Sequence, residues 1–136
     1  MDPNPDGYKR SKSPLHTKSY LFAVRIIKMY QYLVGNTQCY DIAHQVVRSG
    51  TSIGASVRES EFAQSPQDFI NKLSISLKEA NETDYWLHLL SDTGFIDDKM
   101  FESMSTDCNE LIAMLISSIK TSKQRYIKQD SKGYAI

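Results

Sequence analysis

The sequence is poor in the residues that cross-link, break or bend a chain. Its 136 residues include two cysteines, four prolines and six glycines, and no apolar run approaches the ~20 residues of a membrane span. Cys39 and Cys108 are too few for a disulfide framework and too far apart for a short zinc motif, so reduced, packed thiols are expected. Residues 1–7 also lack the charged-then-apolar layout of a signal peptide. These absences favour a soluble, cytoplasmic protein without membrane contact.

Net charge of one sign is missing as well. Sixteen basic residues balance sixteen acidic ones, which argues against a uniformly basic nucleic-acid binder. The length of 136 residues and an apolar content of 40% suit one globular domain with its own core. Residues 1–14 are polar and basic and 129–136 are polar, so both read as flexible tails around a domain at 15–128.

Apolar residues recur at helical spacing in four segments of this domain. The spacing predicts helices over 15–34, over 41–63, from Pro66 to Gly94, and from Asp97 to about Lys128. Four helices with short connections predict an all-α, up-down-up-down antiparallel four-helix bundle.

Local signals define several helix ends. Gly35 and Asn36 are expected to end the first helix, because both tolerate the left-handed conformation. Ser65 can cap the third helix, with Pro66 in its first turn and Asp68 reaching back.

The apolar surface exceeds what one bundle needs. The first helix carries a second stripe beside its main one, and the second and fourth helices are similarly broad. Burial of this surplus in a homo-oligomer is one interpretation. The alternative is a single broad core with tilted helices.

Candidate catalytic residues are not recognisable. The three histidines, His16, His44 and His88, do not form the Glu-x-x-His pairs of di-metal bundles. Asp84 and His88 are four residues apart, which surface ion pairing explains equally well. No phosphate loop, nucleophile elbow or Cys–His arrangement is present. The sequence therefore predicts no catalytic residue, no cofactor and no metal site, and so no enzyme.

The second helix is unusual because small and hydroxyl residues occupy its middle, where intrinsic helix propensity is poor. Two glycines four residues apart allow a close approach of another backbone, and the hydroxyls can bond to a neighbouring helix. We predict helix packing or an oligomer contact at these positions, and both versions stay open. The residues are Arg48, Ser49, Gly50, Ser52, Gly54 and Ser56.

This segment also carries a family resemblance. The run RSGTSIGASVRE at 48–59 resembles the R-S-x-x-S-I-x-A-N-x-x-E signature of the 23S rRNA intervening-sequence proteins. The run DFINKLSISLKEANET at 68–83, followed by YWL at 85–87, is similar to a second motif of that family, and the match covers about residues 20–120. Gly50, Ser56 and Ser60 depart from its usual Ala, Asn and Gly.

The resemblance implies an antiparallel four-helix bundle that assembles as a ring-like homopentamer. A related group, the accessory proteins of diversity-generating retroelements, uses such a barrel to bind nucleic acid and a reverse transcriptase. The signature residues are expected to serve the fold and the subunit contact rather than an active site.

Charge is unevenly distributed along the chain. In an up-down bundle, the start of the first helix and the end of the fourth share one pole, and basic residues gather there. We predict nucleic-acid binding through the phosphates at this basic pole, although helix-dipole preferences explain part of the pattern. The candidate residues are Lys9, Arg10, Lys12, Lys18, Lys120, Lys123, Arg125 and Lys128.

The sequence therefore predicts a non-enzymatic, homo-oligomeric helical scaffold that binds RNA or DNA. The alternative is a protein adaptor ring for a polymerase or reverse transcriptase-like partner, which exposed aromatic residues would anchor. Candidate anchors are Tyr20, Tyr32, Tyr40, Tyr85 and Trp86.

Overall fold

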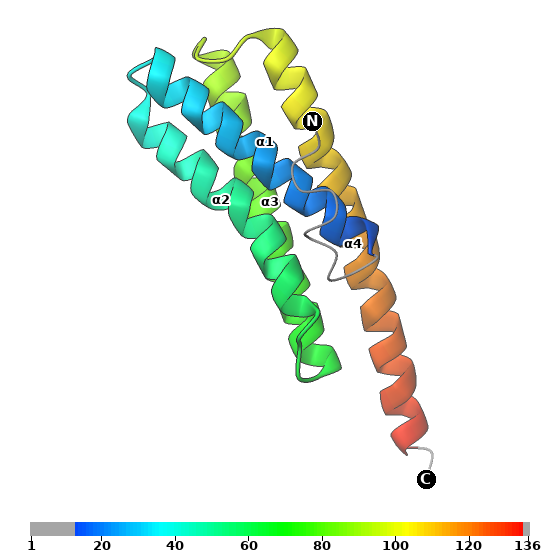
Figure 1. The fold of residues 1–136 in the computed structure, drawn as a ribbon. Coiled ribbons are helices and arrows are strands. Elements are labelled where there is room, and N and C mark those ends of the chain that lie inside the picture. The colour runs from blue at the N-terminus through cyan, green and yellow to red at the C-terminus, as the bar shows by residue number, and fades with distance from the viewer. Residues whose placement is uncertain (1–12, 135–136) are drawn as a thin grey trace.

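The computed structural model describes the backbone of residues 13–134 and the side chains of 13–128. Four helices run alternately up and down, and no strand occurs in the described range (Figure 1). The all-α, four-helix prediction is confirmed at this level. The helices are α1 (Pro14–Asn36), α2 (Tyr40–Ser60), α3 (Pro66–Asp92) and α4 (Asp98–Tyr134).

The helices pack in chain order, α1 on α2, α2 on α3 and α3 on α4, whereas α1 and α4 share a much smaller contact. α4 has 37 residues and α2 only 21. Figure 1 shows the last part of α4 extending past the start of α1 and away from the turn between α2 and α3. One end of the bundle therefore carries a projecting helix.

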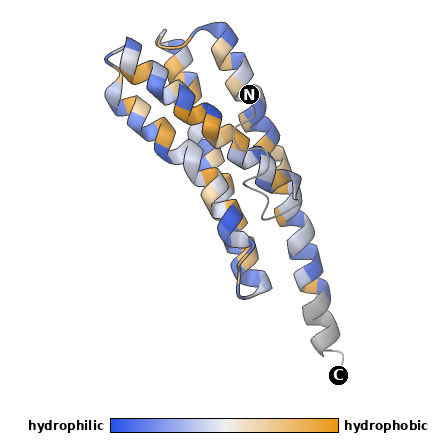
Figure 2. Cartoon of the chain, in the orientation of Figure 1, coloured by the Kyte–Doolittle hydropathy of each residue, from blue (hydrophilic) through white to orange (hydrophobic). Residues whose placement is uncertain are grey.

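Apolar residues lie along all four helices (Figure 2), and the core forms where the main stripes meet. On α1 the predicted stripe is buried, with Ile26 and Leu33 fully inaccessible. The second stripe is not fully covered, since Ile27 is 44% exposed and Tyr30 is only half-buried. The bundle alone thus leaves part of the surplus apolar surface in solvent.

Three predicted end signals are confirmed. Ser65 Oγ accepts a hydrogen bond from the Asp68 N–H at 3.0 Å, which caps α3. Asp97 Oδ1 accepts one from the Met100 N–H at 2.8 Å, which caps α4. Gly94 follows α3 with φ +80°, a conformation that favours glycine.

The predicted end of α1 is wrong. Gly35 and Asn36 both belong to the helix, and neither adopts a positive φ. Thr37 ends the helix instead, because its N–H (3.0 Å) and its hydroxyl (2.6 Å) both donate to the Leu33 carbonyl. That pair of bonds makes a left-handed cap unnecessary.

Two other ends differ from the prediction. α2 ends at Ser60 rather than at residue 63. α4 continues to Tyr134 rather than stopping near Lys128, and no proline interrupts this stretch. Residues 129–134 of the predicted C-terminal tail are therefore helical in backbone. Most of the predicted N-terminal tail, residues 1–12, lies outside the described residues.

Candidate nucleic-acid interface and the packing of α2

The glycines of α2 face α1 inside the same chain. A Cβ atom added at Gly50 would lie 2.8 Å from two side-chain carbons of Ile26. One added at Gly54 would lie 3.2 Å from the backbone oxygen of Ser19. Since both contacts are intramolecular, the close approach predicted for this stripe occurs between α1 and α2.

The hydroxyl groups on the other side of α2 meet α3. Thr83 Oγ1 lies 2.9 Å from Ser49 Oγ and 2.8 Å from the Glu79 carbonyl oxygen. Ser76 donates to the Ile53 carbonyl at 2.8 Å. These hydroxyl groups are buried, so hydrogen bonds between the two helices offset their desolvation.

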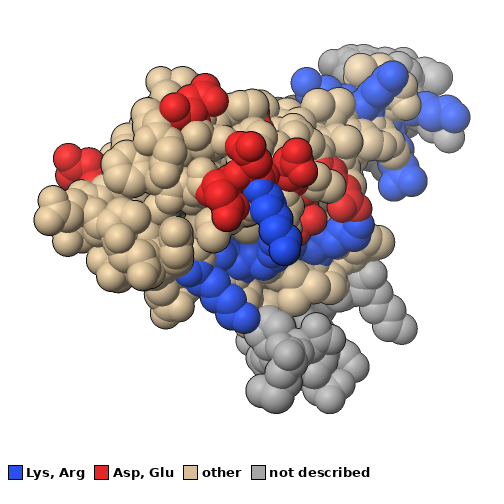
Figure 3. Space-filling view, turned by 90° about the horizontal axis from the view of Figure 1, so that it is seen from above, with Lys and Arg blue, Asp and Glu red and all other residues tan. Residues whose placement is uncertain are grey.

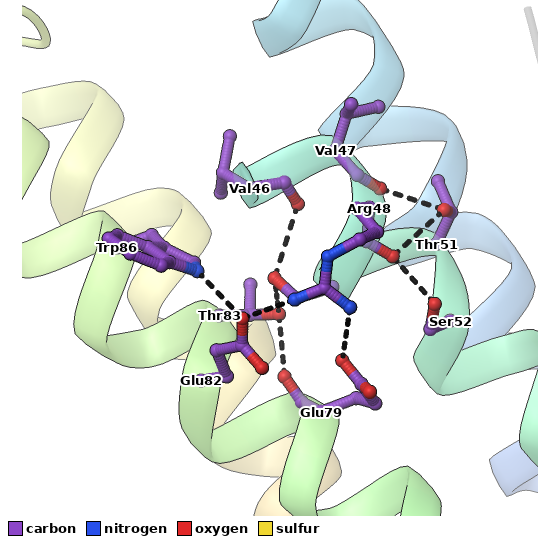
Figure 4. A network of polar contacts seen from close by, with 10 residues as sticks. Val46, Val47, Arg48, Thr51, Ser52, Glu79, Glu82, Thr83 and Trp86 are labelled. Atoms are coloured by element: carbon purple, nitrogen blue, oxygen red, sulfur yellow. Dashed lines mark hydrogen bonds and ion pairs between the residues drawn. The ribbon is translucent and has the colours of Figure 1, made fainter. Parts of the chain in front are cut away.

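Arg48 extends this contact toward the surface (Figure 4). Its guanidinium pairs with Glu82 and lies 3.5 Å from the Glu79 carboxylate. Trp86 Nε1 donates to Glu82 Oε1 at 3.2 Å, so this candidate adaptor residue already has an internal partner. The Arg48–Glu82–Trp86 network holds α2 against α3.

The remaining two residues of the predicted α2 set have local roles. Ser52 donates to the Arg48 carbonyl at 2.6 Å, one turn earlier in α2. Ser56 is buried within the bundle. Five of the six α2 candidates thus contact a neighbouring turn or helix of this chain through interactions that the structure specifies.

The structure divides the predicted basic pole. Lys18 pairs with Glu110 across the junction of α1 and α4, and Arg25 pairs with Asp107 beside it. Lys120 lies ten residues beyond Glu110 in α4, which is about 15 Å along the helix at 1.5 Å per residue. Lys18 therefore belongs to an internal ion pair, at a distance from the α4 cations. Lys9, Arg10 and Lys12 lie outside the described residues.

The other four candidates are brought together at the projecting end of α4. All four are exposed, and none forms an ion pair with a carboxylate in the described part of the chain. Figure 3 shows basic side chains gathered at this end, whereas acidic and basic side chains lie side by side over the central face. We call them the α4 basic end: Lys120, Lys123, Arg125 and Lys128.

Acidic residues gather at the other end of the bundle, at the starts of α2 and α4, and helix capping explains them. Asp97 caps α4, and Asp98 and Asp41 lie in the first turns of α4 and α2. Acidic groups at these positions interact favourably with the helix dipole. Among the described side chains, the charge asymmetry that helix capping leaves unexplained lies at the α4 basic end.

Some exposed apolar side chains were not singled out from the sequence, namely Phe62 and Ile127, whereas Ile116 belongs to the broad apolar stripe predicted for the fourth helix. Phe62, just after α2, is 66% exposed, and Ile127 and Ile116 on α4 are 63% and 51% exposed. Among the predicted aromatic anchors, Tyr85 is exposed by 57%, and Tyr32 and Tyr40 are also exposed. Periodicity could also have found Ile127, which falls on the same face of α4 as Ile116.

The reactive side-chain types among residues 13–128 are dispersed or paired. No three His, Cys, Asp or Glu side chains lie together in a way that could hold a metal ion there. His88 Nε2 and Asp84 Oδ1 are 3.6 Å apart, a surface pair. Burial raises the pKa of Cys108 to about 12, so its thiol stays neutral and poorly nucleophilic. None of the described helices carries an apolar stretch that could cross a bilayer.

Comparison with known proteins decides the family. The model of the 23S rRNA-intervening sequence protein family matches residues 12–117. The chain belongs to this family. A protein of unknown function from the S23 ribosomal protein family of Bacteroides thetaiotaomicron, whose crystal structure is known, is 52% identical in sequence to this chain. The match covers 78% of this chain and 98% of that one, with a TM-score of 0.77. No curated protein matches the chain.

Proposed function

We propose that this member of the 23S rRNA-intervening sequence protein family is a non-enzymatic, homo-oligomeric helical scaffold of the cytoplasm. It binds nucleic-acid phosphates through the α4 basic end. The observation that carries the proposal is the contrast between two groups of cations. Lys18, Arg25 and Arg48 are each paired with a carboxylate, whereas the four cations of the α4 basic end are exposed and unpaired in the described part of the chain.

Assembly into a ring, a homopentamer in the proposal, strengthens this surface. The exposed Phe62, Ile116 and Ile127 supply apolar area that soluble monomers rarely leave uncovered. Cyclic repetition would place several copies of the α4 basic end around one opening, which raises the local positive potential. Light scattering tests the assembly directly, and a clean monomer in solution would contradict it.

The proposed contact is with phosphates rather than with base edges. Lysine and arginine neutralise phosphates and release counterions, so affinity falls as salt rises. Neither a recognition helix nor an RNA-recognition motif is visible in the sequence. Binding should therefore depend weakly on nucleotide sequence and strongly on salt.

Fluorescence anisotropy with mixed-sequence RNA and duplex DNA tests this function. We expect Arg125→Gln and Lys128→Gln each to reduce the slope of log affinity against log salt by about 1. Lys78→Gln is the matched control, an exposed α3 lysine away from the α4 basic end, and should leave the slope unchanged. Absence of binding at low salt, or binding without salt dependence, would rule the function out.

A protein adaptor ring for a polymerase or reverse transcriptase-like partner is the second candidate. The exposure of Tyr85 and Tyr40 favours it, since aromatic side chains often anchor protein interfaces. Neutralising Arg125 and Lys128 together separates the candidates in a pull-down. Retention of a protein partner together with loss of nucleic acid would favour the adaptor.

A further inference from the structure

Two apolar surfaces near one end of the bundle have no partner within the described chain. The first, the α3–α4 groove, has a volume of about 370 Å³. Its floor is apolar, and two lysines stand at its rim. Its principal residues are Leu77, Ile116, Ile119, Lys120, Lys123 and Ile127.

The second surface is a hollow around Phe62 between the end of α2 and the start of α3. Phe62 is the most exposed large apolar side chain in the described range, at 66%. Ala55 and Glu59 of α2 and Lys72 of α3 line the hollow with it. A phenylalanine that fills an apolar groove buries a large area, which makes Phe62 the projecting half of a potential contact.

We propose that Phe62 of one copy inserts into the α3–α4 groove of a neighbouring copy. This inference rests on the homo-oligomer of the proposed function and names its contact. Because the two surfaces differ, the contact is heterologous, and such contacts build rings when the rotation closes. A second copy is the occupant that carries both surfaces, so each subunit gives one side chain and receives one.

The positions of the two surfaces suit a closed ring. Phe62 follows α2 at the turn into α3, and the last part of α4, which carries the groove residues, extends past the level of this turn (Figure 1). Both surfaces therefore lie toward the same end of the bundle. Subunits joined at similar heights return to the first copy without the rise that would make a filament.

The two surfaces also lie on different faces of the bundle. The hollow lies at the α2–α3 junction and the groove at the α3–α4 junction. One subunit can therefore give Phe62 to one neighbour and receive Phe62 from another, as a heterologous ring requires.

Charged side chains on the two surfaces would orient one copy against the other. The groove lining contains Lys120 and Lys123 and no carboxylate. Around Phe62 the hollow is lined by Arg58 and Lys72 as well as by Glu59 and Asp68. The Glu59 side chain is 62% exposed and lies 3.5 Å from Lys72. A carboxylate so exposed is open to a lysine of the neighbouring copy, and complementary charges of this kind orient an interface.

This assignment divides the α4 basic end. At about 100° per residue, Lys120, Lys123 and Ile127 fall on the groove side of α4. Arg125 lies on the side of α4 opposite the groove, and Lys128 lies next to Arg125. Lys120 and Lys123 are thus assigned to the subunit contact, and Arg125 and Lys128 to the phosphates.

The first test is the solution mass of Phe62→Ser, with Tyr85→Ser as the control of similar exposure on another face. Since Phe62 contributes little to the core, circular dichroism should show unchanged helicity. We expect assembly to weaken at least tenfold in Phe62→Ser and to stay unchanged in Tyr85→Ser. An oligomer that persists in Phe62→Ser leaves the groove to residues 1–12 or to another protein and overturns the inference. A monomeric wild type contradicts the proposed assembly itself.

The second test is a charge exchange. Lys123→Glu and Glu59→Lys should each weaken assembly several-fold, and the doubly substituted chain should recover most of the loss because each contact regains one opposite pair. Ala113→Glu, at an exposed α4 position outside the groove lining, is the control and should leave assembly intact. If the double variant assembles no more strongly than the more impaired single variant, the two residues do not meet across the contact.

Discussion

The middle of α2 and the projecting end of α4 are both helical, but they differ in residue type and in the contacts that they make. Apart from Ile53, residues 49–56 of α2 are small or hydroxyl-bearing, and backbone and hydroxyl groups of this stretch contact α1 and α3. Residues 120–128 of α4 are mostly long, with five lysine, arginine or glutamine residues that favour helix, and most are exposed. The stretch with the stronger sequence signature is therefore structural within this chain, and the less distinctive stretch holds the unpartnered groups.

The difference also concerns the source of stability. Tertiary contacts hold α2 in a helix despite poor intrinsic propensity, whereas propensity supports the end of α4 with few tertiary contacts. Substitutions in α2 should therefore reduce global stability, whereas substitutions at the α4 basic end should change assembly or nucleic-acid binding and leave the stability of the fold intact. The following predictions test this division in order of expected effect.

The largest effect is expected at Gly54. Leucine there must displace the backbone of Ser19, 3.2 Å from the new Cβ, and we expect a loss of about 3 kcal/mol. Gly35→Ala is the control, because no atom lies within 4 Å of its new Cβ. A helical glycine replaced by alanine in open space should stabilise by about 0.5–1 kcal/mol. Urea denaturation measures both, and an unchanged midpoint in Gly54→Leu would contradict the packing account.

The second prediction concerns the pH dependence of stability, to which the packed half of α4 contributes through the buried Cys108. Burial raises the pKa of Cys108 to about 12, while an unfolded thiol ionises near 8.5. Its contribution to stability is fully present below pH 8.5 and is lost as pH rises toward 12. Between pH 8 and 10 the loss should reach about 2 kcal/mol. Cys108→Ala should lose less over the same interval, and an identical pH dependence would refute the assignment.

The hydroxyl contact between α2 and α3 should have a moderate effect. Thr83→Val removes the hydrogen bond to Ser49 in a buried site, and we expect a loss of about 1–1.5 kcal/mol. Thr106→Val is the control on exposed α4, where the hydroxyl bonds only to the Glu102 carbonyl. Its thermal midpoint should hardly move. Equal losses in the two variants would show that hydroxyl burial does not distinguish the regions.

The smallest effect compares two arginines. Arg25 pairs with Asp107 and contacts Ser103, so Arg25→Gln should cost up to about 1 kcal/mol, less at high salt. Arg125 has no ion pair in the described part of the chain, and Arg125→Gln should stay within about 0.5 kcal/mol of the parent. Chemical denaturation at two salt concentrations measures the difference. A larger loss in Arg125→Gln would place an unrecognised structural contact at the α4 basic end.

The fold could be predicted well because its signals are local. Apolar periodicity located four helices, and the side chains of Ser65 and Asp97 mark two helix starts correctly. The prediction fails at Thr37, where a threonine side chain replaces the expected glycine-type cap. Such an end depends on which carbonyl a hydroxyl reaches, and residue spacing does not reveal that.

The candidate site was less predictable because it depends on relative positions of helices. Lys18 looked equivalent to Lys120 in an idealised bundle, but their neighbours differ, and Glu110 lies against Lys18 only because α1 starts partway along α4. The partner helices of Gly50 and Gly54 could not be read from α2 itself. Phe62 lies outside every periodic stripe, so its exposure emerges only from the folded chain.

The projecting end of α4 should also be the part of the chain that a protease cleaves first. Trypsin cleaves after lysine and arginine, and four such residues lie within nine positions on a segment that contributes little to the core. Exposed segments of low local stability are cut before buried ones. Brief digestion should therefore shorten α4 and spare α2, and any molecule seated on this end should slow that cleavage in proportion to its occupancy.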